Sequence, residues 1–172
     1  MLNVRVSLSM ALCLSVSTLT AQARPAAPDR SQIRREVESR TRGMIQAFER
    51  GDLRAVARFY ADDARIYASG TAVEGRAEID RFWLKIRHPS SWVMETVDVG
   101  GSRDEPYQLV RSILVQKAGV HADTSLAMCL LVWRREADGL LRVRLDVFAV
   151  LPEAKIGLSE LRRRYGIRPR EN

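Results

Sequence analysis

The chain has 172 residues, of which 46% are hydrophobic and 28% charged, which suits one domain with a buried core. Its formal net charge of +7 is carried by 25 arginines and three lysines, and its two cysteines are Cys13 and Cys129. Such a charge can keep a protein soluble or attract an anionic partner, with lipid headgroups or surface polymers as candidates.

Residues 1–23 are typical of a cleaved secretory signal peptide. Arg5 precedes the apolar run LSMALCLSVSTLTA, which is short for a bilayer span, and Ala21-Gln22-Ala23 offers small residues at a cleavage site. We expect cleavage near Ala23, export to the periplasm or the medium, and a mature chain with Cys129 as its single thiol, so no internal disulfide. The alternative is an uncleaved N-terminal anchor. For the exported chain we expect no nucleic-acid partner and no stable membrane span.

Residues 24–30 are expected to form a linker, and helical patterns follow. Apolar residues recur at spacings of four, seven and four from Ile33 to Phe48, which predicts a helix with Ser31 as its N-cap and Gly51 as its stop. Asp52 can cap a second, short helix over residues 52–60. Residues 76–86 predict a third helix, because the proline of the following HPSS stretch ends helical geometry.

Strand patterns separate and follow these helices. Residues 61–68 (ADDARIYA) predict a brief strand, and Gly70 and Gly75 frame a short hairpin. From residue 91 the apolar period changes to two and predicts four long strands, at 91–101, 107–117, 125–135 and 140–150. We therefore expect an α+β domain over residues 31–151, with three N-terminal helices packed on one face of a curved, mostly antiparallel sheet, and a basic tail over 152–172.

The strand at 125–135 is apolar on both of its faces. Leu130 belongs to one alternating set and Cys129 to the other, and each set consists of apolar residues over SLAMCLLVW. A sheet covered by helices on one side should carry polar residues on the other. We therefore expect a homodimer through the outer sheet face. The alternative is that the basic tail folds back over that face.

Three stretches, FERGDLRAVARFYADDARIY, VEGRAEIDRFW and LLRVRLDVFAV, together resemble the NTF2-like superfamily. This superfamily includes SnoaL-like polyketide cyclases, DUF4440-type domains and ketosteroid isomerases. The resemblance spans about residues 31–151 and implies a cone-shaped fold with a mostly apolar pocket. It implies little about activity, because one scaffold hosts many functions.

The resemblance argues against ketosteroid isomerase activity. Counted from the shared motifs, the base and the two oxyanion donors of those enzymes fall on Ala68, Met44 and Leu131, with a residue or two of uncertainty at Leu131. All three residues are apolar, so the carboxylate base and the paired donors of that mechanism are missing.

Asp146 is the best candidate for a reactive or ligand-orienting residue. The resemblance implies that Arg144, Asp146, Phe148 and Val150 face the pocket, and SnoaL-like cyclases carry an acid/base aspartate on this strand. Arg144 or Arg111 could hold Asp146 ionised, in which case it would bind rather than catalyse. The alternative is a partly buried salt bridge that stabilises the sheet.

Aromatic residues could supply the rest of a pocket or belong to the ordinary core. The ligand-binding residues we predict are Tyr60, Tyr67, Trp83, Arg111, Arg144, Asp146 and Phe148, and bulky Trp83 or Phe148 could also close the pocket. The neighbouring Asp62 and Asp63 are expected to organise the turn into the first strand rather than to act as an acid/base pair. His88 and His121 are isolated, so we predict neither a metal site nor a cofactor.

Three functions are compatible with these features. The first, which we favour, is a binding module that holds a small hydrophobic ligand. The second is a SnoaL-like enzyme, of a cyclase, isomerase or hydrolase type, with Asp146 as its acid/base. Export and the lack of a second recognisable catalytic group count against it. The third is an interaction domain with a vestigial pocket, whose apolar sheet face binds another protein.

Overall fold

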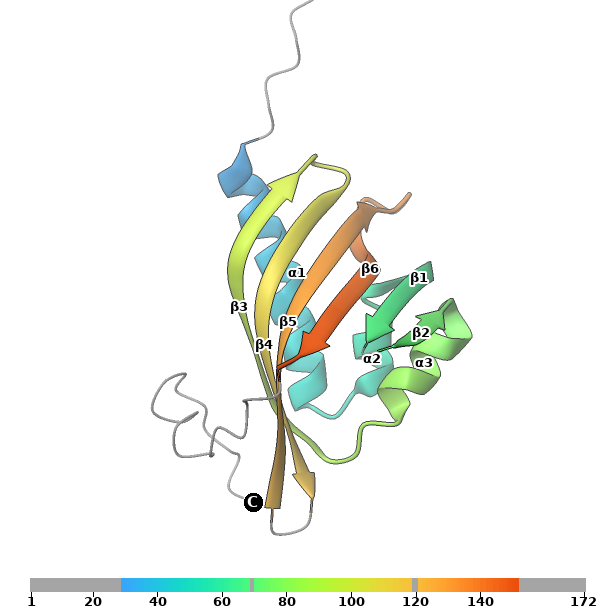
Figure 1. Ribbon diagram of the computed structural model, residues 1–172. Coiled ribbons are helices and arrows are strands. Elements are labelled where there is room, and N and C mark those ends of the chain that lie inside the picture. The colour runs from blue at the N-terminus through green and yellow to red at the C-terminus, as the bar shows by residue number, and fades with distance from the viewer. Residues whose placement is uncertain (1–28, 69, 119–120, 152–172) are drawn as a thin grey trace, which may run out of the picture.

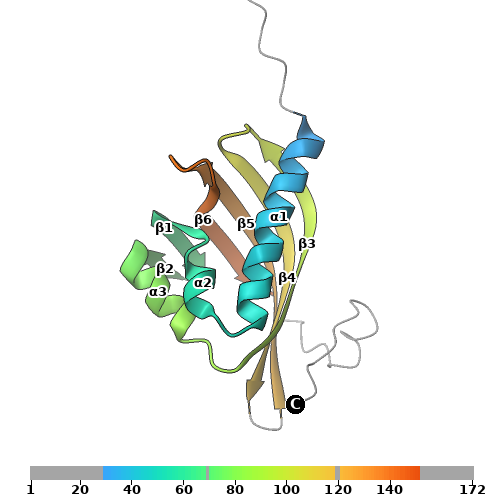
Figure 2. The same cartoon turned by 180° about the vertical axis from the view of Figure 1, so that it is seen from behind.

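Three helices pack against a six-stranded sheet in the computed structural model, which describes residues 29–68, 70–118 and 121–151 (Figures 1 and 2). This arrangement confirms the expected α+β class. The predicted signal peptide with its cleavage site, most of the predicted linker, and the basic tail lie outside the described residues. None of the helices described is long and apolar enough to cross a membrane.

The first helix, α1 (Arg30–Glu49), packs its apolar stripe against the sheet and buries Val37, Met44 and Phe48 completely. Its N-cap is Asp29, whose carboxylate accepts a hydrogen bond from the Ser31 amide at 2.9 Å. The helix therefore begins slightly earlier than the predicted cap at Ser31. Gly51 follows its end with a φ of 75°, a left-handed conformation that glycine adopts without strain.

Two shorter helices lie at one edge of the sheet (Figure 1). Asp52 caps α2 (Leu53–Ala57) as predicted, accepting a hydrogen bond from the Ala55 amide at 2.8 Å. This helix is shorter than predicted because β1 (Tyr60–Ala68) already begins at Tyr60. The hairpin to β2 (Thr71–Glu74) leads into α3 (Arg76–Leu84), which buries Ile79 and Trp83.

Four longer strands complete the sheet: β3 (Pro89–Gly101), β4 (Pro106–Ala118), β5 (His121–Arg135) and β6 (Leu141–Val150). The strand order is β2-β1-β6-β5-β4-β3, and only the β1–β6 pair is parallel. The predicted antiparallel meander is confirmed. The strands bend, and α1 lies across one face of them (Figure 2). The space between this face and α3 is where the site forms.

A β-bulge in β6 changes which of its residues face inward. Val132 of β5 pairs with Leu145, whereas Trp133 pairs with Val143, so Arg144 is an extra residue in β6. Before the bulge Val143 is buried, and after it Asp146 is buried. Arg144 is exposed, and the prediction that it shares a face with Asp146 is wrong. Strict alternation along the sequence does not account for the extra residue.

The outer face of the sheet is partly apolar. Leu130 and Val147 are partners across β5 and β6, and they are 37% and 39% exposed. Met128, Val132 and Leu145 around them are half-buried. The homodimer expected from this pattern stays a prediction.

Candidate functional site

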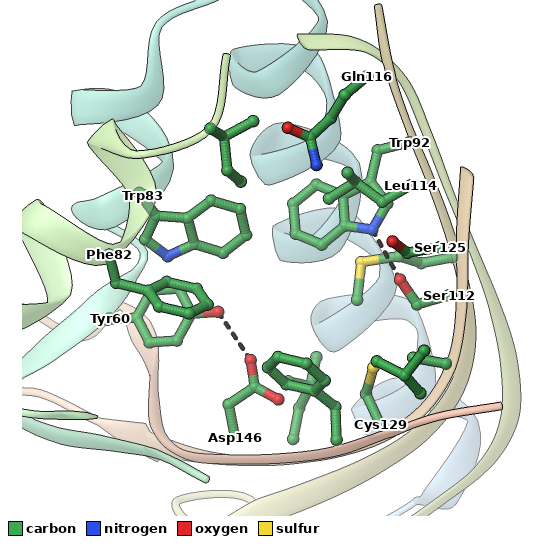
Figure 3. A pocket seen from close by; sticks show the side chains of 16 residues that line it. Tyr60, Phe82, Trp83, Trp92, Ser112, Leu114, Gln116, Ser125, Cys129 and Asp146 are labelled. Atoms are coloured by element: carbon green, nitrogen blue, oxygen red, sulfur yellow. Dashed lines mark hydrogen bonds between the residues drawn. The ribbon is translucent and has the colours of Figure 1, made fainter. Parts of the chain in front are cut away.

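A cavity of about 220 Å³ lies between α3 and the inner faces of β3–β6 (Figure 3). Most of its wall is aromatic, aliphatic or sulfur-bearing. The aromatic residues are Tyr60, Phe82, Trp83, Trp92 and Phe148. Its polar residues lie in two groups: Asp146 next to Tyr60, and Ser112, Gln116 and Ser125 on the opposite wall.

The aromatic wall is a continuous cluster of rings. Trp83 is at its centre, with its ring centroid 6.0 Å from that of Tyr60 and 5.3 Å from that of Trp92. Phe82, the preceding residue of α3, packs edge-on against Trp83 at 5.6 Å. On the side of the cavity opposite Asp146, the indole N–H of Trp92 donates to the Ser112 hydroxyl at 2.8 Å. Such packing fixes the ring positions and gives the cavity a defined shape.

Asp146 and Tyr60 form a buried hydrogen bond although they are 86 positions apart in the chain. The Tyr60 hydroxyl donates to Asp146 Oδ2 at 2.9 Å (Figure 3). The two residues meet because β1 and β6 are neighbouring strands. Asp146 is only 7% exposed, and its other oxygen, Oδ1, has no hydrogen-bond partner among the described residues. One oxygen of a buried carboxyl is therefore left without the bond that such groups normally make.

Burial controls the electrostatics of this pair. It raises the pKa of the Asp146 carboxyl to about 6, and the hydrogen bond from Tyr60 opposes this rise only in part. The pKa of Tyr60 is raised well above its ordinary range by burial and by the nearby Asp146 charge. Burial also raises the pKa of the Cys129 thiol on the same wall. Asp146 can therefore exchange a proton near neutral pH, as acid/base residues do.

Neither arginine proposed for Asp146 reaches the carboxyl. Arg111 pairs with Glu95 at 3.1 Å, and Arg144 pairs with Glu105 at 2.8 Å. No Lys, Arg or His is among the described residues that line the cavity. The prediction that an arginine holds Asp146 ionised is wrong, because strand register and the β6 bulge direct both arginines to other partners.

The sequence matches the SnoaL-like domain over residues 41–143, more than half of the chain. The chain belongs to the SnoaL-like domain family. No protein with a curated description matches it.

Several solved structures share the fold of this SnoaL-like domain. A ketosteroid isomerase-like protein from Erwinia carotovora atroseptica is 20% identical with a TM-score of 0.58, covering 68% of this chain and 95% of that one. An NTF2-like protein with a cystatin-like fold from Novosphingobium aromaticivorans is 15% identical with a TM-score of 0.60, covering 76% and 90%. ActVI-ORFA from Streptomyces coelicolor is 16% identical with a TM-score of 0.57, covering 68% and 96%. These likenesses confirm the NTF2-like cone.

Four of the seven ligand-binding residues predicted for the SnoaL-like domain lie together on the cavity wall: Tyr60, Trp83, Asp146 and Phe148. Tyr67, Arg111 and Arg144 do not line the cavity. Tyr67 is 42% exposed and, like Arg144, borders a surface hollow that contains the Arg65–Glu74 ion pair. The described residues contain no group of three His, Cys, Asp or Glu side chains that could hold a metal ion.

Sequence reasoning missed the polar wall opposite Asp146. Ser112 and Gln116 belong to the alternating set of β4 that contains the buried Val110, and Ser125 belongs to the inward set of β5 that contains Cys129. The period-two pattern could have placed these residues on the inner face. It could not have shown that they lie across a cavity from Asp146, because that depends on the curvature of the sheet.

The remaining motif residues lie outside the cavity or belong to its apolar wall. Asp63 lies within β1 and forms a two-fold ion pair with Arg134, at 2.9 and 2.6 Å, rather than organising the turn before the strand. Met44 is fully buried in the core, and Leu131 is part of the cavity wall. Ala68 is the last residue of β1. The carboxyl–hydroxyl pair of this cavity thus uses positions other than the three isomerase ones.

Proposed function

We propose that this SnoaL-like domain binds a small, largely apolar molecule in its cavity, oriented by Asp146 and Tyr60. The observation that carries this proposal is the buried Asp146 Oδ1, which lacks a partner inside an aromatic cavity. A buried acceptor without a hydrogen bond costs about 1–3 kcal/mol, and a ligand donor would remove that cost. The cavity of about 220 Å³ exceeds the roughly 150 Å³ that accommodates benzene, so it suits one ring with a short substituent.

Native mass spectrometry of the full-length protein, expressed with residues 1–23 and purified from the periplasm, tests this proposal. We expect a bound small-molecule mass in the wild type. Ala127→Phe should lose it, because Ala127 lines the cavity and the added ring would fill the space. Ala77→Phe is the matched control, since Ala77 is exposed on α3. A mass that persists in Ala127→Phe, or a failure of every small aromatic to bind in solution, would overturn the proposal.

We also propose export, which rests on the pattern of residues 1–23. The same spectra give the mass of the chain itself. A chain that begins at Arg24 is the expected result, and a chain that retains Met1 in the periplasmic fraction would contradict cleavage.

Acid/base catalysis is the second candidate function. It is supported by the pKa of about 6 of Asp146 and by the Tyr60 hydroxyl beside it, which supplies the second convergent group that the sequence did not reveal. On a ligand with an acidic C–H bond, Asp146 would accept the proton and return it to another position. Asp146→Asn should then abolish turnover while ligand binding persists. Equal turnover in wild type and Asp146→Asn would exclude this role.

A further inference from the structure

We infer that the ligand is a small aromatic amine in its cationic form, whose ammonium group pairs with Asp146 while its ring lies among the aromatic side chains. This inference rests on the proposed function, since it specifies the chemistry of what the cavity binds. It is carried by three features of the cavity: its charge, its hydrogen-bonding capacity and its rings.

The charge of the cavity is unbalanced. Its titratable side chains are Tyr60, Cys129 and Asp146, and none of the described lining residues is cationic. Tyr60 and Cys129 stay neutral because burial raises the pKa of both groups. An ionised Asp146 therefore has one hydrogen bond and no counter-charge, which is an unfavourable state for a buried carboxylate. A cationic ligand would supply the missing charge.

The hydrogen-bonding capacity at Asp146 points to a donor on the ligand, whereas the indole N–H of Trp83 is a buried donor without a partner in the described part of the chain. Tyr60 uses its single O–H on Oδ2 of Asp146, and Oδ1 has no partner within the described part of the chain. An ammonium group has several N–H donors and no acceptor, so it matches a carboxylate oxygen. A ligand carboxylate would instead place a second negative charge beside Asp146. A neutral alcohol could donate to Oδ1 but would leave the charge uncompensated.

The rings favour a cation as well as an aromatic body. Trp83 lies between Tyr60 and Trp92 in the ring cluster, and Phe82 completes that wall. Aromatic rings attract cations, tryptophan most strongly, and they also pack well against a ligand ring. Opposite Asp146, Gln116 and Ser125 can bind a polar substituent at the far end of that ring (Figure 3).

Isothermal titration calorimetry with three probes of similar shape tests the inference. The probes are 2-phenylethylamine, 2-phenylethanol and 3-phenylpropanoate, titrated into the wild-type protein at about pH 7.5, where the amine is cationic. We expect the amine to bind about tenfold or more tightly than the alcohol, and the propanoate to bind most weakly. Equal or tighter binding of the alcohol would overturn the inference and leave the proposed function intact.

Two controls separate charge pairing from general affinity. In Asp146→Asn the preference for the amine over the alcohol should disappear, while the alcohol still binds. In the wild type, lowering the pH to about 5 should weaken amine binding, because Asp146 becomes protonated, and should leave alcohol binding unchanged. A pH-independent preference for the amine would contradict the pairing. If none of the probes binds the wild type better than the blocked Ala127→Phe variant, the proposed function fails, and this inference fails with it.

Discussion

At the scale of single residues, Asp146 affects both the stability of the domain and its proposed function. Its carboxyl is buried among rings, holds one hydrogen bond from Tyr60, and has an oxygen without a partner among the described residues. A protein selected for stability alone would gain by replacing such a group with a neutral one. Functional sites often contain groups that cost stability in this way.

The pKa of Asp146 predicts how stability depends on pH. Its value of about 6 in the folded domain exceeds the ordinary 3.8. The folded state therefore binds the proton more tightly, and this contribution to stability is full below about pH 4 and is lost as pH rises through about 6. We expect the unfolding free energy of Asp146→Asn to exceed that of the wild type by up to about 3 kcal/mol at pH 8 and by almost nothing at pH 4. Urea unfolding of both proteins at the two pH values measures this difference.

Asp63→Asn is the control for that experiment. The ion pair with Arg134 lowers the pKa of Asp63, so its contribution has the opposite sign and is lost as pH falls. The carboxylate is well exposed, and solvent keeps the effect small. If Asp146→Asn changed stability equally at both pH values, the Asp146 carboxyl would not be the group that titrates.

At the scale of elements, the bulge in β6 determines the composition of the cavity wall. Arg144 is the extra residue, and the two halves of the strand on either side of it both direct their apolar or functional residues inward. Without the bulge, Val143 and Asp146 would lie on opposite faces, because side chains alternate along a regular strand. The bulge is thus what brings Asp146 to Tyr60 while Leu141 and Val143 stay in the core.

Deletion of Arg144 tests whether it is the extra residue of this bulge. Without Arg144 a regular strand keeps Val143 and Asp146 on the inner face, because side chains alternate along it. We expect the deletion to cost less than about 1 kcal/mol of unfolding free energy, since the pair of Arg144 with Glu105 is exposed. Deletion of Arg142 is the control: it turns a buried apolar residue at the start of β6 outward, and exposing one large apolar side chain costs about 1.5–3 kcal/mol. Equal losses for the two deletions in urea unfolding would contradict the role given to the bulge.

At the scale of the whole molecule, the sheet presents two different faces. The inner face carries the helices and the cavity, and the outer face exposes Leu130 and Val147 beside each other. A second copy of the chain could cover that outer face without blocking the cavity. An apolar patch on an otherwise charged domain is typical of such an interface.

Substitution on the outer face tests the predicted homodimer. We expect the wild type to be dimeric in light scattering, and Val147→Lys to weaken the dimer by about tenfold or more, because a charge would be buried at the interface of two basic chains. Leu84→Lys is the control, since Leu84 is 47% exposed on α3, away from this face. A monomeric wild type, or a Val147→Lys dimer of unchanged affinity, would contradict the prediction.

Much of the fold could be predicted from local sequence signals. The helix stop at Gly51, the cap at Asp52, the hairpin between Gly70 and Gly75 and the four long strands all depend on residues close together in the chain. The apolar stripe that buries Val37 and Phe48 does as well. For this reason the sequence by itself determined the α+β class and the order of helices and strands along the chain.

Tertiary structure alone decided how the residues of the site are brought together. The Tyr60–Asp146 bond joins residues 86 positions apart, and the bulge at Arg144 depends on how β6 pairs with β5. The β3–β4 pairing places Arg111 beside Glu95, and Arg144, the bulge residue, pairs with Glu105, so Asp146 lies among rings without a counter-charge. Period and capping are local properties, whereas the burial and the pKa of a carboxyl depend on neighbours that only the folded sheet brings together.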